Sequence, residues 1–379
     1  MKLPLLVAMA GVAFWAWAAL ADQNSQPPQL KPKDYRIGIT PSHLMAEVDP
    51  LFEPDAQWQE VWERIDFYKY YANQLRPPKW LTKLTAGPFA AFMKQHDIAI
   101  ASEFGGFGPG TGKAIPDAAD SAVAMLKPIF DAGGKVDAIH LDGPVRRMLK
   151  GFQKSPNALT LDQIAALLAE FWTKVHKAYP DVEIGLITNF PNWDYTKDLP
   201  GYNGHYTDAS GVTYHEALAR VYEAVTKAGD RIAFVEVDCP YGYYKRTTTR
   251  NADAPVDNQS KFLALQKWCE DRKIKFHIIV NNEIPQPPEG RELTAAEQTG
   301  ADKAFHDGTL EYIRRLREDG IFPDVFLIQS WYVAPAKHLP VAEKYTFMNT
   351  ARQAVALIEK LYPREHPRVR APRKGSNAR

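Results

Sequence analysis

The segment Ala138–Pro144, with the sequence Ala-Ile-His-Leu-Asp-Gly-Pro, indicates how this chain folds more clearly than any other stretch. Side chains alternate along an extended strand, so His140 and Asp142 lie on one face and the apolar residues beside them on the other. A Gly-Pro pair breaks the strand directly after the acid. Because a carboxyl group at the end of a buried strand is costly unless it is paired or used, Asp142 requires a partner or a function.

The sequence on both sides of this segment alternates between strand and helix patterns. Most of the later strands are short, apolar and β-branched, as is typical of parallel strands covered by helices. The order predicts a single (β/α)8 TIM barrel. A doubly wound open sheet is the alternative, but it normally begins with a glycine-rich turn, whereas the first strand here runs into Thr-Pro-Ser-His. The predicted strands are Arg36–Thr40, Ile65–Tyr70, Asp97–Glu103, Ala138–Asp142, Val182–Asn189, Arg231–Asp238, Ile274–Glu283 and Asp324–Trp331. The predicted helices are Gln57–Arg64, Pro88–Gln95, Ser121–Phe130, one that begins at Thr160, Tyr214–Lys227, Gln259–Arg272, Ala301–Arg317 and Thr346–Leu361.

Both ends of the chain are expected to lie outside the barrel. Residues 1–21 have a short basic start, an apolar run and a small-residue cleavage pattern, which together indicate a signal peptide. An uncleaved membrane anchor is the alternative, since the apolar run is just long enough to span a bilayer. We therefore expect a flexible leader over 22–34, a barrel over 35–363 and a basic disordered tail over 364–379. A signal peptide implies a secreted or periplasmic protein with no stable membrane insertion after cleavage.

Charge and composition narrow the range of partners. The whole chain of 379 residues has a formal net charge of +1, and the C-terminal tail is strongly basic, so the remaining body is mildly acidic. An acidic body disfavours a nucleic-acid-binding face. An aromatic content of 12% favours a ligand with flat faces. The 2 cysteines have no histidines at metal-ligand spacing, so we expect no metal. We also expect no cofactor and a monomeric protein.

Polar residues recur where the predicted strands end, which is where chemistry takes place in barrels of this kind. Acids at four strand ends, with amides and aromatics between them, are hard to explain as helix caps alone. Like charges held close together raise some carboxyl pKa values, and glycosidic cleavage uses one protonated and one ionised carboxyl group. The candidate residues are Glu103, His140, Asp142, Asn189, Trp193, Glu236, Asp238, Tyr241, Asn282, Glu283, Gln329 and Trp331.

This arrangement resembles the TIM-barrel glycoside hydrolases, in particular the large clan with an acid/base after strand four and a nucleophilic Glu after strand seven. The resemblance rests on Asp142 at the first position, Glu283 at the second and Trp331 at the end of strand eight, where that clan carries a Trp beneath the sugar. The chain departs from the clan at strand four, where Leu-Asp replaces Asn-Glu. The shorter Asp widens the gap between the carboxyl groups, which suits an inverting mechanism with water between them.

A second pairing stays open. In the α-galactosidase-like barrels, the nucleophile is an Asp after strand four and the acid/base an Asp after strand six, which correspond here to Asp142 and Asp238. Both pairings include Asp142. The other candidates are expected to bind substrate, with amides and His140 on the hydroxyl groups and aromatic rings on the apolar sugar face. Trp193 is expected to be exposed. Each acid also has a structural interpretation, as a helix cap or as the partner of a neighbouring Arg or Lys.

The predicted function is a secreted glycoside hydrolase that cleaves a poly- or oligosaccharide by a two-carboxylate acid/base mechanism. One alternative is a barrel that binds carbohydrate without cleaving it. Another is a metal-dependent hydrolase or phosphodiesterase on the same fold, which needs two or more histidines at strand ends. His43 and His140 are placed for that role, whereas His277 lies early in strand seven.

Overall fold

The computed structural model describes residues 30–366, apart from 43, 45, 78, 80–81, 108–114, 190–192, 200–209, 247–255, 285–290 and 331–332. The predicted signal peptide, and most of the predicted leader and tail, lie outside these residues. Among the helices that are described, none is both long enough and apolar enough to cross a bilayer.

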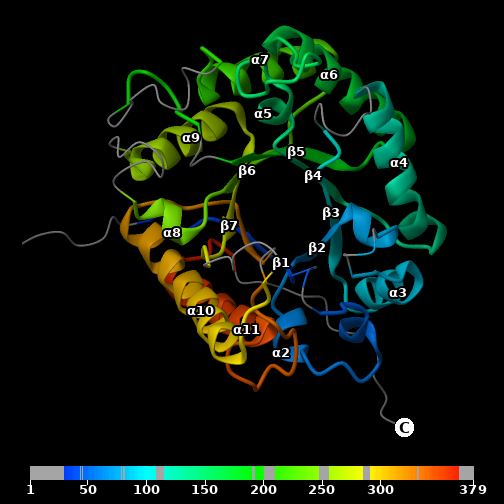
Figure 1. The fold of residues 1–379 in the computed structure, drawn as a ribbon, viewed down its shortest axis with the longest axis vertical. Coiled ribbons are helices and arrows are strands. Elements are labelled where there is room, and N and C mark those ends of the chain that lie inside the picture. Colours follow the sequence, from blue (N-terminus) through cyan, green and yellow to red (C-terminus); the bar gives the residue numbers. More distant parts are fainter. Residues whose placement is uncertain are drawn as a thin grey trace, which may run out of the picture.

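Eight parallel strands close into a barrel, in which each strand pairs with the next along the chain and β8 pairs with β1. The predicted (β/α)8 fold is therefore confirmed, and the strands form the inner ring in Figure 1. The first and fourth strands have the predicted bounds, and the others differ at their ends. The strands are β1 Arg36–Thr40, β2 Phe67–Tyr71, β3 Ala99–Phe104, β4 Ala138–Asp142, β5 Glu183–Asn189, β6 Phe234–Asp238, β7 Lys275–Val280 and β8 Val325–Gln329.

Helices form the outer ring around the strands (Figure 1). They are α2 Gln59–Trp62, α3 Ala86–Gln95, α4 Ile115–Asp131, α5 Pro144–Met148, α6 Leu161–Ala178, α7 Tyr214–Lys227, α8 Tyr241–Tyr244, α9 Asn258–Arg272, α10 Ala295–Glu318 and α11 Phe347–Leu361, with the 3-10 helices η1 Asp49–Phe52 and η2 Ala72–Leu75. Helix α10 begins earlier than predicted because Thr294 caps it, accepting a hydrogen bond from the backbone N–H of Glu297.

Apolar side chains form two separate clusters. The larger one lies between the strands and the helices and includes the outward-facing Ile139 and Leu141 of β4. The smaller one lies inside the barrel and consists of Phe67, Ala101, Ile187, Ile279, Val325 and Leu327, with Ala99 and Ala138 packed against it. Much of the remaining interior is polar, which is unusual for a barrel filled mainly by branched apolar side chains.

Two glycines make room for aromatic rings inside the barrel. A Cβ atom on Gly38 would lie 2.2 Å from the ring of Phe67, and one on Gly185 would lie 2.2 Å from the ring of Phe234. Both distances are too short for any side chain at these positions. The two phenylalanines therefore fill the interior toward the amino ends of the strands, below the polar groups.

The Gly-Pro pair after β4 begins a short helix as well as ending the strand. Gly143 has a φ of 56°, in the left-handed region that glycine adopts readily. Pro144 is the first residue of α5, a position where its missing N–H costs nothing. Helix α5 was not predicted from the sequence, and it brings Arg147 back to the carboxyl group of Asp142.

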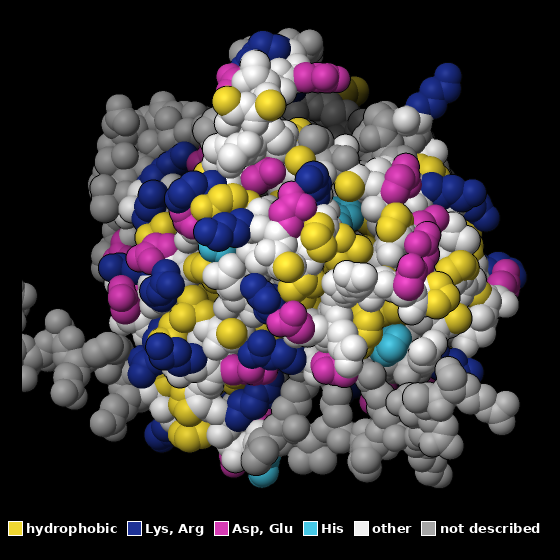
Figure 2. Space-filling model, turned by 90° about the horizontal axis from the view of Figure 1, so that it is seen from below, with side chains coloured by type: hydrophobic (Ala, Val, Ile, Leu, Met, Phe, Trp, Pro, Cys, Tyr) yellow, Lys and Arg dark blue, Asp and Glu magenta, His cyan; other side chains and the backbone are white. Residues whose placement is uncertain are grey.

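Charged side chains of both signs are interspersed over the face shown in Figure 2. Nucleic-acid-binding domains instead gather Lys and Arg on one face or along one helix. Among the described residues on this face, no continuous basic surface is visible.

Candidate active site

A cavity of about 500 Å³ opens at the carboxyl ends of the strands. Three carboxyl groups line it, Glu103 on β3, Asp142 on β4 and Asp238 on β6, together with the amide of Gln329 on β8 and the guanidinium of Arg147 on α5. Apolar walls come from Ile187 and Ile279. The cavity therefore combines three acids with one exposed cation and an apolar surface.

Asp142 is held by an ion pair with Arg147, whose guanidinium also donates a hydrogen bond to the backbone oxygen of Gly105 at 3.2 Å. Burial, and then the negative charge of Glu103, raise the pKa of Asp142 to about 6, although Arg147 opposes this rise. The Asp142 side chain is 28% exposed. This carboxyl group is therefore reachable from the cavity and titrates close to neutral pH.

Asp238 is the least acidic of the cavity carboxyl groups for which a shift is resolved. Burial raises its pKa to about 7, helped by the negative charges of Asp142 and Glu103. Its Oδ1 atom is buried and has no hydrogen-bond partner among the described residues, and the same holds for Oε1 of Gln329. Buried polar atoms are nearly always hydrogen-bonded, so these two atoms are suited to a polar ligand in the cavity.

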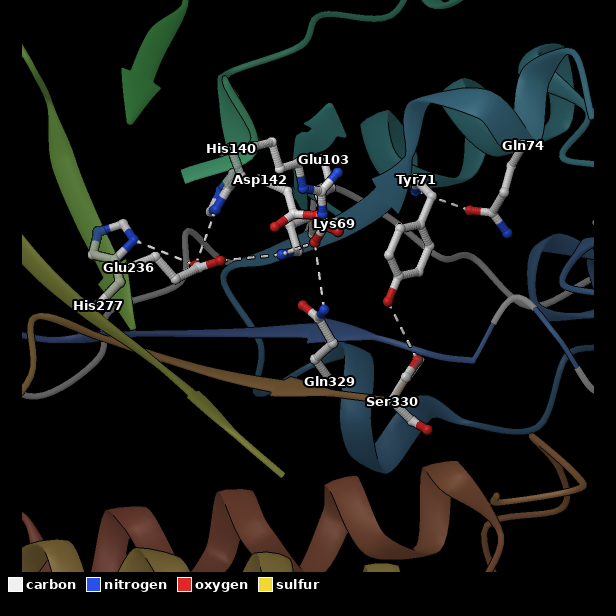
Figure 3. Close-up of polar contacts among 11 residues, drawn as sticks. Lys69, Tyr71, Gln74, Glu103, His140, Asp142, Glu236, His277, Gln329 and Ser330 are labelled. Carbon is white, nitrogen blue, oxygen red and sulfur yellow. Dashed lines mark hydrogen bonds and ion pairs between the residues drawn. The ribbon is translucent and has the colours of Figure 1, made fainter. Parts of the chain in front are cut away.

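Glu103 is linked to the barrel interior by Lys69 on β2. The Lys69 ammonium is fully buried and lies 2.6 Å from Oε2 of Glu103 and 3.1 Å from Oε1 of Glu236. The amide of Gln329 donates a longer hydrogen bond, 3.4 Å, to the same Glu103 oxygen. Figure 3 shows Lys69 between the two carboxylates, with Glu103 on the cavity side.

Two histidines lie beside Glu236, the second carboxylate that Lys69 contacts. His140 Nδ1 lies 2.9 Å and His277 Nδ1 3.8 Å from Oε2 of Glu236 (Figure 3). Burial lowers the pKa of His140, and it lowers that of His277 to about 4, so both rings are neutral at pH 7. Burial alone would raise the pKa of Glu236, but its neighbours His140 and Lys69 outweigh this and hold it well below the usual range.

His140, Glu236 and His277 could also hold a metal ion, since their donor atoms all lie within 4.8 Å of one another. Two histidines and one carboxylate form a common zinc ligand set. The buried Lys69 ammonium, however, already occupies the other oxygen of Glu236. A divalent cation placed there would be repelled by that charge at close range in a dry interior, so we interpret the cluster as a buried polar network in which His140 is hydrogen-bonded to Glu236.

Three of the residues around the cavity were missed in the sequence. Lys69 lies in the run Phe-Tyr-Lys-Tyr-Tyr, where a charged residue within an aromatic strand was the available signal. Tyr71 shares its face and lines the cavity. Arg147 lies one helical turn after the Gly-Pro break, and its role depends on α5. His277 was considered too early in its strand, yet Glu236 pairs with it directly in the β6–β7 register.

Glu283, the predicted nucleophile, is not among the described residues that line the cavity. Its Oε2 atom accepts a hydrogen bond from Arg246 at 2.7 Å. Asn282 joins two helices, because it donates to the backbone oxygen of Ala304 and accepts from the N–H of Gly242. Tyr241 belongs to α8 and packs near Tyr312. The cavity therefore brings together Asp142 and Asp238 rather than Asp142 and Glu283.

The expectation that Trp193 is exposed is wrong. Its side chain is only 2% exposed, and its indole N–H donates to the backbone oxygen of Val212. It packs against Phe152 and Tyr214 and belongs to the larger apolar cluster. Asn189 ends β5, and Trp331 lies outside the described residues.

The fold and the cavity define a TIM barrel with a polar site at the carboxyl ends of its strands. No family model and no curated protein matches the sequence. Among solved structures, the chain is similar to one of two fungal β-1,4-galactanases, with a TM-score of 0.50 and 13% identity over 84% of this chain and 99% of that one.

Two further solved structures are similar at lower TM-scores. Xylanase 10B from Thermotoga maritima gives 0.47, with 12% identity over 85% of this chain and 95% of that one. The catalytic domain of a chitinase from Pyrococcus furiosus gives 0.44, with 12% identity over 86% and 97%. By their names these two are a xylanase and a chitinase. The likeness to the galactanase, at 13% identity, shows the fold alone.

Proposed function

We propose that the chain is a glycoside hydrolase that cleaves O-glycosidic bonds of an oligo- or polysaccharide in the cavity at the carboxyl ends of the strands. The observation that carries this proposal is the convergence of Glu103, Asp142 and Asp238 on one cavity. Two of these acids have pKa values raised to about 6 and about 7. Glycosidic cleavage needs one protonated and one ionised carboxyl group at the same pH, and pKa values that differ supply this.

The surroundings of each acid assign its role. Asp238 has the higher pKa and forms no ion pair with a described residue, so it is the proton donor to the leaving oxygen. Asp142 is the more acidic of the two and its ion pair with Arg147 favours the ionised form, so it attacks the sugar carbon or activates a water. Gln329 and the apolar walls are positioned to contact the sugar ring. This is the α-galactosidase-like pairing of an Asp after strand four with an Asp after strand six.

The test is a set of three single variants assayed on a panel of aryl glycosides and soluble polysaccharides. Asp142→Asn and Asp238→Asn should each lower turnover by about 10²–10⁴-fold, the usual contribution of a positioned acid or base. Glu283→Gln serves as the matched control and should retain most activity, because Glu283 contacts Arg246 outside the cavity.

Each other outcome favours a different function. Loss of activity in Glu283→Gln with activity retained in Asp238→Asn would restore the pairing of Asp142 with Glu283. Sugar binding without turnover in the wild type would indicate the non-catalytic alternative. Activity that a chelator abolishes and zinc restores would indicate a metal-dependent hydrolase.

Secretion is part of the same proposal and rests on the sequence of residues 1–21. N-terminal sequencing of the protein from a secreting host should find Asp22 as the first residue. A retained Met1 would instead support the membrane anchor.

A further inference from the structure

Inside the barrel, a chain of charged contacts runs from the cavity to the interior histidines and involves residues that the proposed reaction does not use directly. Glu103 is the last group with access to the cavity, and its side chain is 11% exposed. Lys69 and Glu236 behind it have side chains that are 0% exposed. His140 and His277 end the chain of contacts on the far side of Glu236 (Figure 3). No other cation among the described residues contacts Glu103.

A buried ammonium is stable only when it is paired, and Lys69 has two carboxylate partners from different strands. Glu236 is separated from Lys69 by 167 residues and Glu103 by 34, so the three groups meet only because the barrel closes. With two partners on opposite sides, the Lys69 ammonium cannot move toward one without leaving the other. The Glu103 carboxylate is therefore held in one place at the cavity wall.

We propose that Lys69 is a positioning residue that fixes the Glu103 carboxylate beside Asp142 and Asp238. The balance between the positive charge of Lys69 and the negative charge of Glu103 then sets the pH range in which the site works. This inference rests on the proposed glycoside hydrolase function for its consequence in catalysis. The charge balance itself can be measured without any substrate.

The charges of Lys69 and Glu103 change the pKa values of Asp142 and Asp238 in opposite directions. Burial and then the charge of Glu103 raise the pKa of Asp142, and Lys69 lowers it. For Asp238, burial, Asp142 and Glu103 raise the pKa, and Lys69 again lowers it. Among the described residues, the titratable and charged groups around these two acids are Lys69 and Tyr71 on β2, Glu103 on β3, His140 on β4, Arg147 on α5, Glu236 on β6, Cys239 directly after β6, His277 on β7 and Tyr312 on α10.

The experiment compares Glu103→Gln with Lys69→Met. Carboxyl ¹³C NMR of Asp-labelled protein follows the titration of Asp142 and Asp238, assigned with the two Asn variants. Glu103→Gln removes a negative charge and should move both titrations to lower pH, on the order of 1 pH unit. Lys69→Met removes a positive charge and should move both to higher pH by a similar amount. A purely structural role for Lys69 would not give shifts of opposite sign.

Lys69→Met leaves Glu236 buried without its cation, and this variant can fail to fold. The double variant Lys69→Met/Glu236→Gln removes both interior charges and keeps a hydrogen-bonding partner for His140. In this background the titration of Asp142 should still move to higher pH, since Lys69 acts on it directly.

The matched control is an ion pair at the opposite end of the same barrel. Lys275 and Glu183 begin β7 and β5 and lie 2.7 Å apart. Lys275→Met and Glu183→Gln make the same charge changes far from the cavity, so the two titrations should stay within 0.2 pH units, roughly the limit expected for screened charges.

The inference is overturned if Lys69→Met and Glu103→Gln shift the titrations in the same direction, or if neither moves them more than the control pair does. Stoichiometric metal that is lost in His277→Ala would also overturn it, because the interior cluster would then be a metal site. If the wild type cleaves no glycoside but the two variants still shift the titrations in opposite directions, the proposed function is rejected and the inference about the charge balance stands.

Discussion

At the scale of single residues, the cavity separates two aspartates by their surroundings. Asp142 has Arg147 as a partner, whereas Asp238 has a buried oxygen with no partner among the described residues. The pKa values of both aspartates lie above the ordinary Asp range, and that of Asp238 is raised further. In the proposed reaction, environment more than residue type therefore assigns one acid as proton donor and the other as the ionised group.

These pKa values predict the pH dependence of kcat/KM. The ionised form of Asp142 is lost as the pH falls through about 6. The protonated form of Asp238 is lost as the pH rises through about 7. The profile should therefore be bell-shaped with its maximum between these values, measured on any glycoside that the wild type cleaves. A profile that stays flat from pH 5 to pH 8 would contradict both role assignments.

At the scale of elements, the position of the site depends on how the strands fill the barrel. Phe67 and Phe234 fill its amino end because Gly38 and Gly185 have no side chains. Above them, β2, β3, β4, β6 and β7 contribute the polar network, and the last inward-facing residues of β3, β4 and β6 are the cavity acids. The same alternation along the strands therefore produces an apolar base, a charged middle and a rim that carries the candidate catalytic acids.

The variant Gly185→Ala tests whether the Phe234 ring needs the space that the glycine leaves. The new Cβ would meet the Phe234 ring at 2.2 Å, so the ring or the strand must shift. We expect a loss of about 1–3 kcal/mol in the free energy of unfolding, typical of overpacking, measured by urea denaturation. Gly300→Ala in α10 is the matched control, because nothing lies within 4 Å of its new Cβ. It should gain about 0.5–1 kcal/mol, and equal effects at the two sites would refute the packing argument.

At the scale of the whole molecule, the active site is a source of instability. Asp238 has a folded-state pKa of about 7, well above the ordinary range of an aspartate, because folding buries it beside other acids. The folded state therefore disfavours its charge, and stability is lost as the pH rises from about 4 through about 7. A site that needs a protonated acid near neutral pH carries this cost in stability.

Asp238→Asn should therefore stabilise the protein while it removes activity. At pH 8 the free energy of unfolding should exceed that of the wild type by at least about 1 kcal/mol, since a shift of one pKa unit corresponds to about 1.4 kcal/mol. Near pH 4, Asp238 is protonated in the folded state and about half ionised in the unfolded state, so the difference should be small. Urea unfolding at the two pH values measures the difference in the free energy of unfolding. A variant less stable than the wild type at pH 8 would contradict the claim that burying Asp238 costs stability.

The sequence by itself determined the eight strands, their order and the polar residues at their ends. Strand alternation, Gly-Pro breaks and caps such as Thr160 are local, so they can be read without knowing the fold. The candidates Asp142, Asp238, Glu103 and Gln329 follow from that alternation, and all four line the cavity.

Only the tertiary structure decided which groups meet. Lys69 acts through a contact across 167 residues, and barrel closure creates that contact. Glu283 follows its strand by three residues, and its direction depends on Arg246 in a separate loop. Local pattern places a residue on a strand face, but the partners of a charge are set by long-range packing. The partner of Asp142 was therefore left open by the sequence, and the cavity favours Asp238.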